Sequence, residues 1–254
     1  MNGYVRGRRG AAPAALICLA LTLALTGCGE DEPAGDTNGI ADLPAEKIEK
    51  KARKAAERAG SVRLSGTVIS QGQTYRLEMR LKESGGIGEV SAKGGDNFQL
   101  VRVEKDLYLK ADSEFWARQE NSGKDEKPSE SDVTVARKLE GKYVKVPRKD
   151  PAYEQLSGFT NLSVMLGGLL VLNGERETGD ESEVSGRRTI QVNANGGKGG
   201  TIDVALTGTP YPLRLQRGGS AGTVTLADWD SGFSLRAPKK DQIVDYGKKI
   251  SASE

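Results

Sequence analysis

The stretch Tyr75-Arg76-Leu77-Glu78-Met79-Arg80-Leu81-Lys82 decides the fold, because apolar and charged side chains alternate along it with a period of two. Successive side chains of a β-strand point to opposite faces of a sheet, so this alternation predicts a strand with one apolar and one charged face. The apolar face is expected to carry Tyr75, Leu77, Met79 and Leu81. Such a strand is typical of an antiparallel sheet with one face on a core and the other in water.

Similar short segments lie on both sides of this strand. The other predicted strands are marked, in chain order, by Val62/Leu64/Val68 and by residues 98–103, 107–109, 190–194, 202–206, 213–215 and 224–226. Glycine-rich turns separate several of them, for example at residues 195–200. We expect the acidic segment 177–183 to be a solvated turn. The pattern predicts a long, mainly antiparallel sheet.

A helix is expected from Pro44 to Ala59, with Pro44 in its first turn and Gly60 as its stop signal. Its apolar face consists mostly of alanine, which can cover a sheet but fills little volume. A second, short helix is expected near Asp150–Ser157, and residues 119–132 are expected to form a long solvated loop.

Residues 161–172 are rich in leucine around Gly167-Gly168 and are too short to span a bilayer. They predict either a buried core helix or a helical lid over an apolar cavity. Two glycines within a helix lower its stability by roughly 1 kcal/mol each relative to alanine, which a movable cover tolerates.

A large sheet twists and curls, and a curled sheet covered by helices with small side chains tends to enclose an apolar hollow. An apolar pocket of this kind is the default site for a small-molecule ligand. The candidate lining residues are Leu64, Val68, Tyr75, Leu77, Met79, Leu81, Met165, Leu166, Leu169 and Leu170. A shift of one residue in register would exchange the two sheet faces, so the choice of concave face stays open.

The amino terminus has the layout of an export signal. Arg6, Arg8 and Arg9 precede an apolar run over residues 14–25, and Leu25-Thr26-Gly27-Cys28 forms a lipobox. We expect residues 1–27 to be a lipoprotein signal peptide, Cys28 to be lipidated and residues 28–43 to be a flexible tether to a single domain over residues 44–250. The alternative, an uncleaved transmembrane helix, needs about 20 apolar residues.

Composition excludes several classes of function. The 254-residue chain contains no histidine, and its two cysteines, Cys18 and Cys28, fall in the signal and at the lipidation site. Ser-His-Asp and Cys-His nucleophile systems and the usual zinc sites are therefore ruled out, so we predict no enzyme, no metal site and no cofactor. Residues 1–27 hold three arginines and no acid, so their removal changes the net charge from +2 to −1. That balance argues against nucleic acid as a partner.

Several short motifs resemble the LppX/LprAFG lipoproteins of actinobacteria. They are Tyr108-Leu109-Lys110 followed by Phe115-Trp116, residues 142–147 before a helix, and a tail with residues 224–230, Ala237-Pro238 and Ile243-Val244-Asp245. The resemblance implies an α+β fold, a strongly curved antiparallel half-barrel with a few helices over its concave face, similar to the LolA/LolB carriers. It also implies the binding and carriage of acylated lipids.

The sequence thus predicts an extracytoplasmic lipoprotein, held to the cell membrane through Cys28, that binds an acylated lipid or another hydrophobic ligand. The alternative is a non-enzymatic interaction or sensory-accessory lipoprotein that has no ligand and presents its polar sheet face to a protein partner.

Overall fold

The computed structural model describes residues 37–70, 72–93, 97–120 and 129–244. The chain divides into two compact units, Met1–Ala34 and Gly35–Glu254, and every described residue belongs to the second. The predicted signal peptide and Cys28 lie outside the described residues. Within the described part, no helix is both long enough and apolar enough to cross a membrane.

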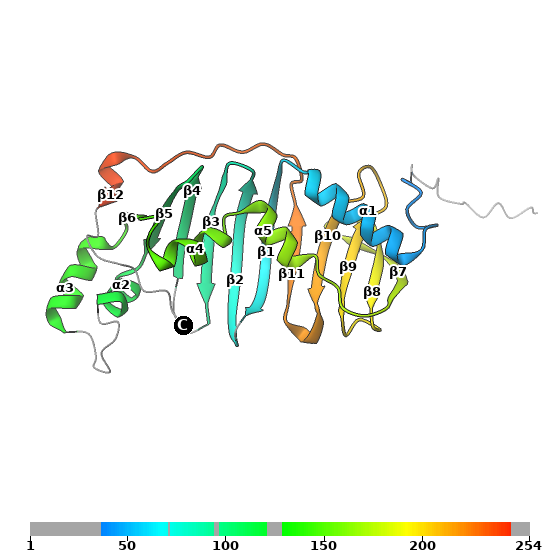
Figure 1. Cartoon of the computed structure of the whole chain (residues 1–254), viewed down its shortest axis with the longest axis horizontal. Coiled ribbons are helices and arrows are strands. Elements are labelled where there is room, and N and C mark those ends of the chain that lie inside the picture. The colour runs from blue at the N-terminus through cyan, green and yellow to red at the C-terminus, as the bar shows by residue number, and fades with distance from the viewer. Residues whose placement is uncertain (1–36, 71, 94–96, 121–128, 245–254) are drawn as a thin grey trace, which may run out of the picture. The chain divides into compact units, whose positions relative to one another are not determined.

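The strands form one twelve-stranded sheet with the order β12-β6-β5-β4-β3-β2-β1-β11-β10-β9-β8-β7 (Figure 1). All described strand pairs are antiparallel except β12 with β6. The strands are β1 Ser61–Ser70, β2 Gln73–Lys82, β3 Gly85–Ala92, β4 Asn97–Val103, β5 Asp106–Ala111, β6 Tyr143–Val146, β7 Arg176–Val184, β8 Arg187–Ala194, β9 Gly200–Ala205, β10 Pro212–Arg217, β11 Gly222–Ala227 and β12 Ile243–Val244.

Two meanders make up this sheet. Strands β1 to β6 follow one another in order, as do β7 to β11, and the β1–β11 pair joins the two series. Strands β6 and β7 therefore lie far apart in the sheet although they are consecutive in sequence. The sheet is open, because β7 and β12 are its two edges.

The connection from β6 to β7 crosses one face of the sheet as α4 (Pro151–Gly158) and α5 (Leu162–Leu169) (Figure 1). Helix α1 (Ala45–Arg58) lies on the same face, against β7 to β10. Helices α2 (Ser113–Glu120) and α3 (Glu130–Leu139) lie between β5 and β6 in the chain. The α+β class and the open, curved sheet with helices on one face are thus as the sequence predicted.

Strand β2 shows why the helices lie on this face. Leu77, Met79 and Leu81 are at most 1% exposed, whereas Arg76 and Glu78 are exposed. The buried side chains belong to one hydrophobic core that also includes the inner residues of α1 and α5. The predicted period of two is therefore confirmed, and it assigns the apolar face of the sheet to the helices.

Three local expectations need correction or extension. Residues 177–183 are not a turn but belong to the edge strand β7, which hydrogen-bonds to β8. The expected loop 119–132 overlaps the end of α2 and the start of α3, and its residues 121–128 lie outside the described part. The end of the expected tether is packed, because the Asn38 amide donates to the Leu206 carbonyl at 2.8 Å and Ile40 is 2% exposed.

After β11 the chain runs along the ends of the strands and reaches β12 beside β6 (Figure 1). We call residues 228–239 the strap. A turn fixes its start, because the Asp230 carboxylate accepts a hydrogen bond from the Gly60 amide at 2.6 Å and another from the Tyr211 hydroxyl. Trp229 stacks on Tyr211 with ring centroids 4.6 Å apart.

This turn should be visible in the pH dependence of stability. Burial and then the hydrogen bond to Asp230 raise the pKa of Tyr211 to about 12. A group whose pKa is raised by folding contributes stability below its unfolded pKa of about 10 and loses that contribution as the pH rises through the folded value. The free energy of unfolding should therefore fall more steeply between about pH 10 and 12 in the wild type than in Tyr211→Phe. Chemical denaturation across this range measures the difference, and parallel curves would contradict the assignment.

Candidate functional site

The structure brings the predicted apolar residues together on the helix-covered face. Leu64, Val68, Leu77, Met79 and Leu81 are buried in the core, with Tyr75 packed against it. From the helix layer, Leu166, Leu169 and Leu170 are also buried in this core, and Met165 packs on it. The sheet residues thus form the floor and the α5 residues form the cover of the same apolar layer.

The inward side of helix α5 is apolar, and its outward side also carries few polar side chains. Asn161 caps its start, because Oδ1 accepts a hydrogen bond from the Val164 amide at 3.1 Å. Leu162 and Leu166 are buried, whereas Val164 is 57% exposed. An added Cβ at Gly167 or Gly168 would meet no atom of the described residues within 4 Å, so the outer surface of the helix is open there.

A groove lies between α1 and α5. Its volume is about 290 Å³, close to the lower end of the range for small-molecule pockets, roughly 300 Å³. It is lined by Arg53, Ala56, Glu57, Leu162, Ser163, Leu166, Gly167 and Leu170. The apolar side chains form its base, and Arg53, Glu57 and Ser163 provide polar groups at its border. The groove can therefore take an apolar chain together with a polar group at one end.

Charged groups hold the carboxyl end of α5 against α1. Arg53 Nη1 donates to the carbonyl of Leu170 at 2.8 Å, which gives an otherwise unpartnered helix-end carbonyl a cationic donor. Glu49 is 9% exposed and accepts from Arg176 Nε at 2.7 Å, and Arg176 Nη2 donates to the Leu172 carbonyl at 2.9 Å. The hydrogen bond to Glu49 raises the pKa of Arg176.

A second anchor fixes the turn between α4 and α5. Arg102 on β4 points to the inner face, where Nε donates to Thr160 Oγ1 at 3.0 Å and Nη2 to the Thr160 carbonyl at 2.8 Å. Burial lowers the pKa of Arg102. Gly86 on the neighbouring strand permits this close approach, because an added Cβ would lie 3.1 Å from the Thr160 carbonyl oxygen. Helix α5 is thus held at both ends, with its glycine pair between the anchors.

The structure separates the predicted lining into two groups. Leu166 and Leu170 border the groove directly. Leu64, Leu77, Met79 and Leu81 instead lie under the helices as packed core residues. Sequence reasoning missed Arg53, Ala56 and Glu57 as groove residues, although the alanine face of α1 was expected to fill little volume. Among the described residues, no group of three or more acidic, histidine or cysteine side chains could hold a metal ion.

The comparisons with known proteins concern the fold. Neither a protein-family model nor a curated protein sequence matches the chain. Among solved structures, the chain is similar to LprF from Mycobacterium bovis, with 14% identity, a TM-score of 0.49, and coverage of 76% of this chain and 96% of that chain. It is also similar to the lipoprotein LppX from Mycobacterium tuberculosis, with 13% identity, a TM-score of 0.42, and coverage of 76% and 98%. LprF and LppX are lipoproteins of the group that the sequence motifs resemble.

The glycine pair of α5 generates a stability prediction. Because no atom lies near an added Cβ, Gly168→Ala should raise the free energy of unfolding by about 0.5–1 kcal/mol through the lower backbone entropy of the unfolded chain. The contrasting variant is Gly88→Ala, whose added Cβ would overlap the carbonyl oxygen of Glu78. Its free energy of unfolding should fall by about 1–3 kcal/mol. Denaturant titration measures both, and destabilisation by Gly168→Ala would show that the pair is needed for packing.

Proposed function

We propose that this protein is a membrane-anchored extracytoplasmic lipoprotein that binds an acylated lipid or a similar hydrophobic ligand in the groove between α1 and α5. The observation that carries this proposal is an apolar groove that lies directly over the hydrophobic core and has charged groups at its border. Burial of an acyl chain there gains about 0.8 kcal/mol per CH₂ removed from water.

The ligand site extends, in this proposal, from the groove toward the core beneath α5. The groove alone has the volume of a small pocket, so a long acyl chain needs more room. The residues that would supply it are Met165, Leu166, Leu169 and Leu170 of the cover and the sheet residues below them, which include Leu64, Val68, Tyr75, Leu77, Met79 and Leu81. Outward movement of α5 about its two anchors would expose them, and Gly167-Gly168 weakens the helix at that place.

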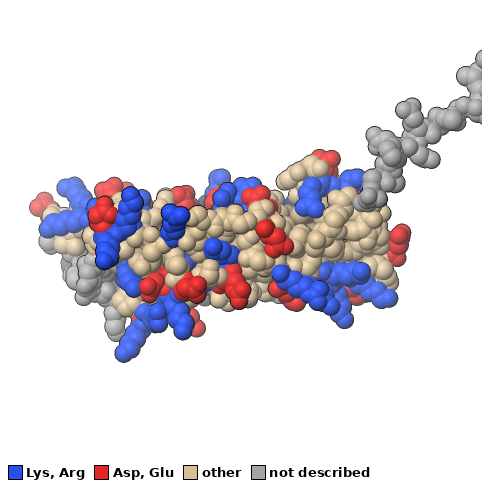
Figure 2. All heavy atoms as spheres, turned by 90° about the horizontal axis from the view of Figure 1, so that it is seen from above, with Lys and Arg blue, Asp and Glu red and all other residues tan. Residues whose placement is uncertain are grey.

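The membrane is the source of ligand in this proposal, and Cys28 is the anchor. About ten residues separate Cys28 from the packed Asn38, and an extended chain of that length spans at most about 35 Å. The exposed residues of α1 include five cations, Lys47, Lys50, Lys51, Lys54 and Arg58. Figure 2 shows Lys and Arg side chains gathered where α1 lies. Such a basic face favours a position near an anionic lipid surface.

Filling the groove tests the proposal. Gly167→Phe places a ring where the groove has open space, so it should remove lipid binding while the fold is kept. Gly168→Phe is the matched control, because that position is equally open but does not line the groove. The measurement is native mass spectrometry of the full chain released from a non-ionic detergent, after incubation with envelope lipids. A lipid-sized adduct is expected for the wild type and Gly168→Phe, and at least about tenfold less for Gly167→Phe.

Two outcomes would redirect the assignment. An adduct that persists in Gly167→Phe would remove the groove as the site. A wild-type chain without any adduct would favour the alternative of an interaction lipoprotein without a ligand, which presents the polar face of the sheet to a protein partner.

Anchoring has its own test. Cys28→Ser should remove the diacylglyceryl group, so the chain should no longer be found in the membrane fraction as a lipidated species. Mass spectrometry of the amino-terminal peptide measures the modification directly. Cys18→Ser is the control, since Cys18 lies within the expected signal and should leave the modification unchanged.

A further inference from the structure

We propose that the outer face of the sheet carries an anion-binding site between Arg63 of β1 and Arg80 of β2, and that its ligand is a tetrahedral oxyanion of the phosphate type. This face is opposite the one that the helices cover, so the site is separate from the groove and does not depend on the function proposed for it.

The register of the sheet places the two arginines directly across from each other. Arg63 pairs with Arg80 in the β1–β2 ladder, and like charges in that arrangement are destabilising. Asp228 compensates one of them, since its Oδ2 lies 2.9 Å from Arg63 Nε in an ion pair. This contact lacks the geometry of a hydrogen bond, so within the described part of the chain the buried Arg63 Nε has no hydrogen-bond partner. Arg80 has neither a hydrogen bond nor an ion pair to any described residue.

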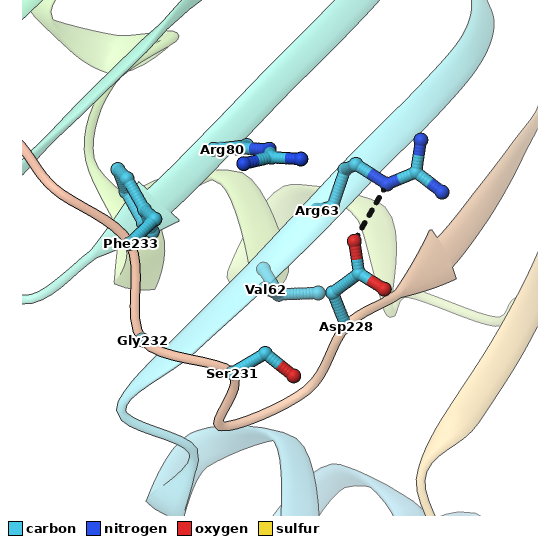
Figure 3. A pocket seen from close by; sticks show the side chains of 7 residues that line it. All are labelled: Val62, Arg63, Arg80, Asp228, Ser231, Gly232 and Phe233. Atoms are coloured by element: carbon cyan, nitrogen blue, oxygen red, sulfur yellow. Dashed lines mark ion pairs between the residues drawn. The ribbon is translucent and has the colours of Figure 1, made fainter.

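A hollow lies between these side chains (Figure 3). Its volume is about 170 Å³, well above the roughly 30 Å³ that one water molecule occupies, so it has room for a small oxyanion with some of its water. Its lining consists of Val62, Arg63, Arg80, Asp228, Ser231, Gly232 and Phe233. Among the described residues of the lining, the ionic groups are two guanidinium groups and one carboxylate, which together carry a net positive charge.

The strap that forms the other wall is held in place. Asp228 and Asp230 both have positive φ, at 52° and 55°, a conformation that aspartate adopts more readily than most residues. The Asp230 amide donates to the Ser61 carbonyl at 3.0 Å, and the Ser231 amide donates to the Asp228 carbonyl at 3.1 Å. The turn at the hollow is thus formed before any ligand enters.

A third cation stands beside the hollow. Lys82 Nζ lies 5.2 Å from the centroid of the Phe233 ring and 3.3 Å from the Phe233 carbonyl oxygen, to which it donates. It fixes Phe233 at the border and adds positive charge on the same side of β2 as Arg80. The nearest acidic residue of that strand face, Glu78, faces Ser65 and Glu89 on the adjacent strands rather than the arginine pair.

The arrangement fits a tetrahedral anion better than a planar one. Each guanidinium presents a planar fork of donors that matches phosphate or carboxylate oxygens. Because the two forks come from neighbouring strands, an anion that satisfies both needs oxygens directed to two sides, which a phosphate group has. The hydroxyl of Ser231 is a further donor of the lining. Free phosphate and the phosphate of a lipid headgroup share this chemistry.

The test is isothermal titration of the full chain, in non-ionic detergent and at constant ionic strength, with inorganic phosphate and separately with dihexanoyl phosphatidic acid. Arg80→Gln should weaken phosphate binding by about tenfold or more, because it removes a charge-assisted contact. Arg76→Gln is the matched control, since Arg76 lies on the same strand and face but opposite Thr67 and outside the hollow. Arg63→Lys keeps the charge and loses the fork, so it should weaken binding while the fold stays intact.

The outcomes distinguish both the ligand source and the groove. Binding of inorganic phosphate that Arg80→Gln weakens supports a soluble phosphate ligand. Binding of the phosphatidic acid alone, again weakened by Arg80→Gln and unchanged by Gly167→Phe, supports a lipid headgroup. Absence of binding with both probes, or equal affinity in wild type and Arg80→Gln, would overturn the site whatever the result for the groove.

Discussion

The connection between β6 and β7 is the constraint on which the rest of the structure depends. Apart from β6, each strand from β1 to β10 is a neighbour in the sheet of the strand that follows it in the chain, but the β1–β11 pair places β6 and β7 at distant positions. The chain must therefore cross the sheet, and it does so on the face where Leu77, Met79 and Leu81 would otherwise meet water. Because burial of that face is the main stabilising contribution, the crossing segment has to be apolar and helical.

This constraint also explains why the groove lies where it does. Helix α1 covers β7 to β10 and α5 extends the cover beyond it, so the border between two separately positioned helices falls over the core. Helices with alanine and glycine at their border leave space that larger side chains would fill. The ion pair of Arg176 with Glu49 and the bond from Arg53 to the Leu170 carbonyl hold the helices together at one end of that border. The groove is therefore a consequence of topology combined with small side chains.

The strands and helices that could be predicted from the sequence are those whose signals lie within a few neighbouring residues. The alternation in β2, the proline at the start of α1 and the side-chain cap Asn161 of α5 are all signals within a few residues. Strand β7 gave no such signal. Its inner and outer positions are both rich in charge, and it is a strand because β8 provides backbone partners and because an edge strand can remain solvated. Likewise, Leu166 and Leu170 of the candidate groove were predicted from the leucine-rich segment, whereas Arg53, Ala56 and Glu57 became groove residues only through the packing of α1 beside α5.

On the outer face of the sheet, the charge of one arginine is compensated by the protein alone, without a ligand. Arg214 on β10 lies opposite Asp203 on β9, a carboxylate that is fully buried and accepts from Arg214 at 2.8 and 3.0 Å. Ser182 and Gln191 complete the partners of Asp203, and the hydrogen bond to Asp203 raises the pKa of Arg214. Arg63 and Arg80 lie opposite each other instead, and the one carboxylate nearby, Asp228, pairs with Arg63 alone. Between β9 and β10 the sheet places an acid opposite an arginine, whereas between β1 and β2 it places two guanidinium groups opposite each other beside room for an anion. This contrast is the reason to assign a ligand to the second arrangement and a structural role to the first.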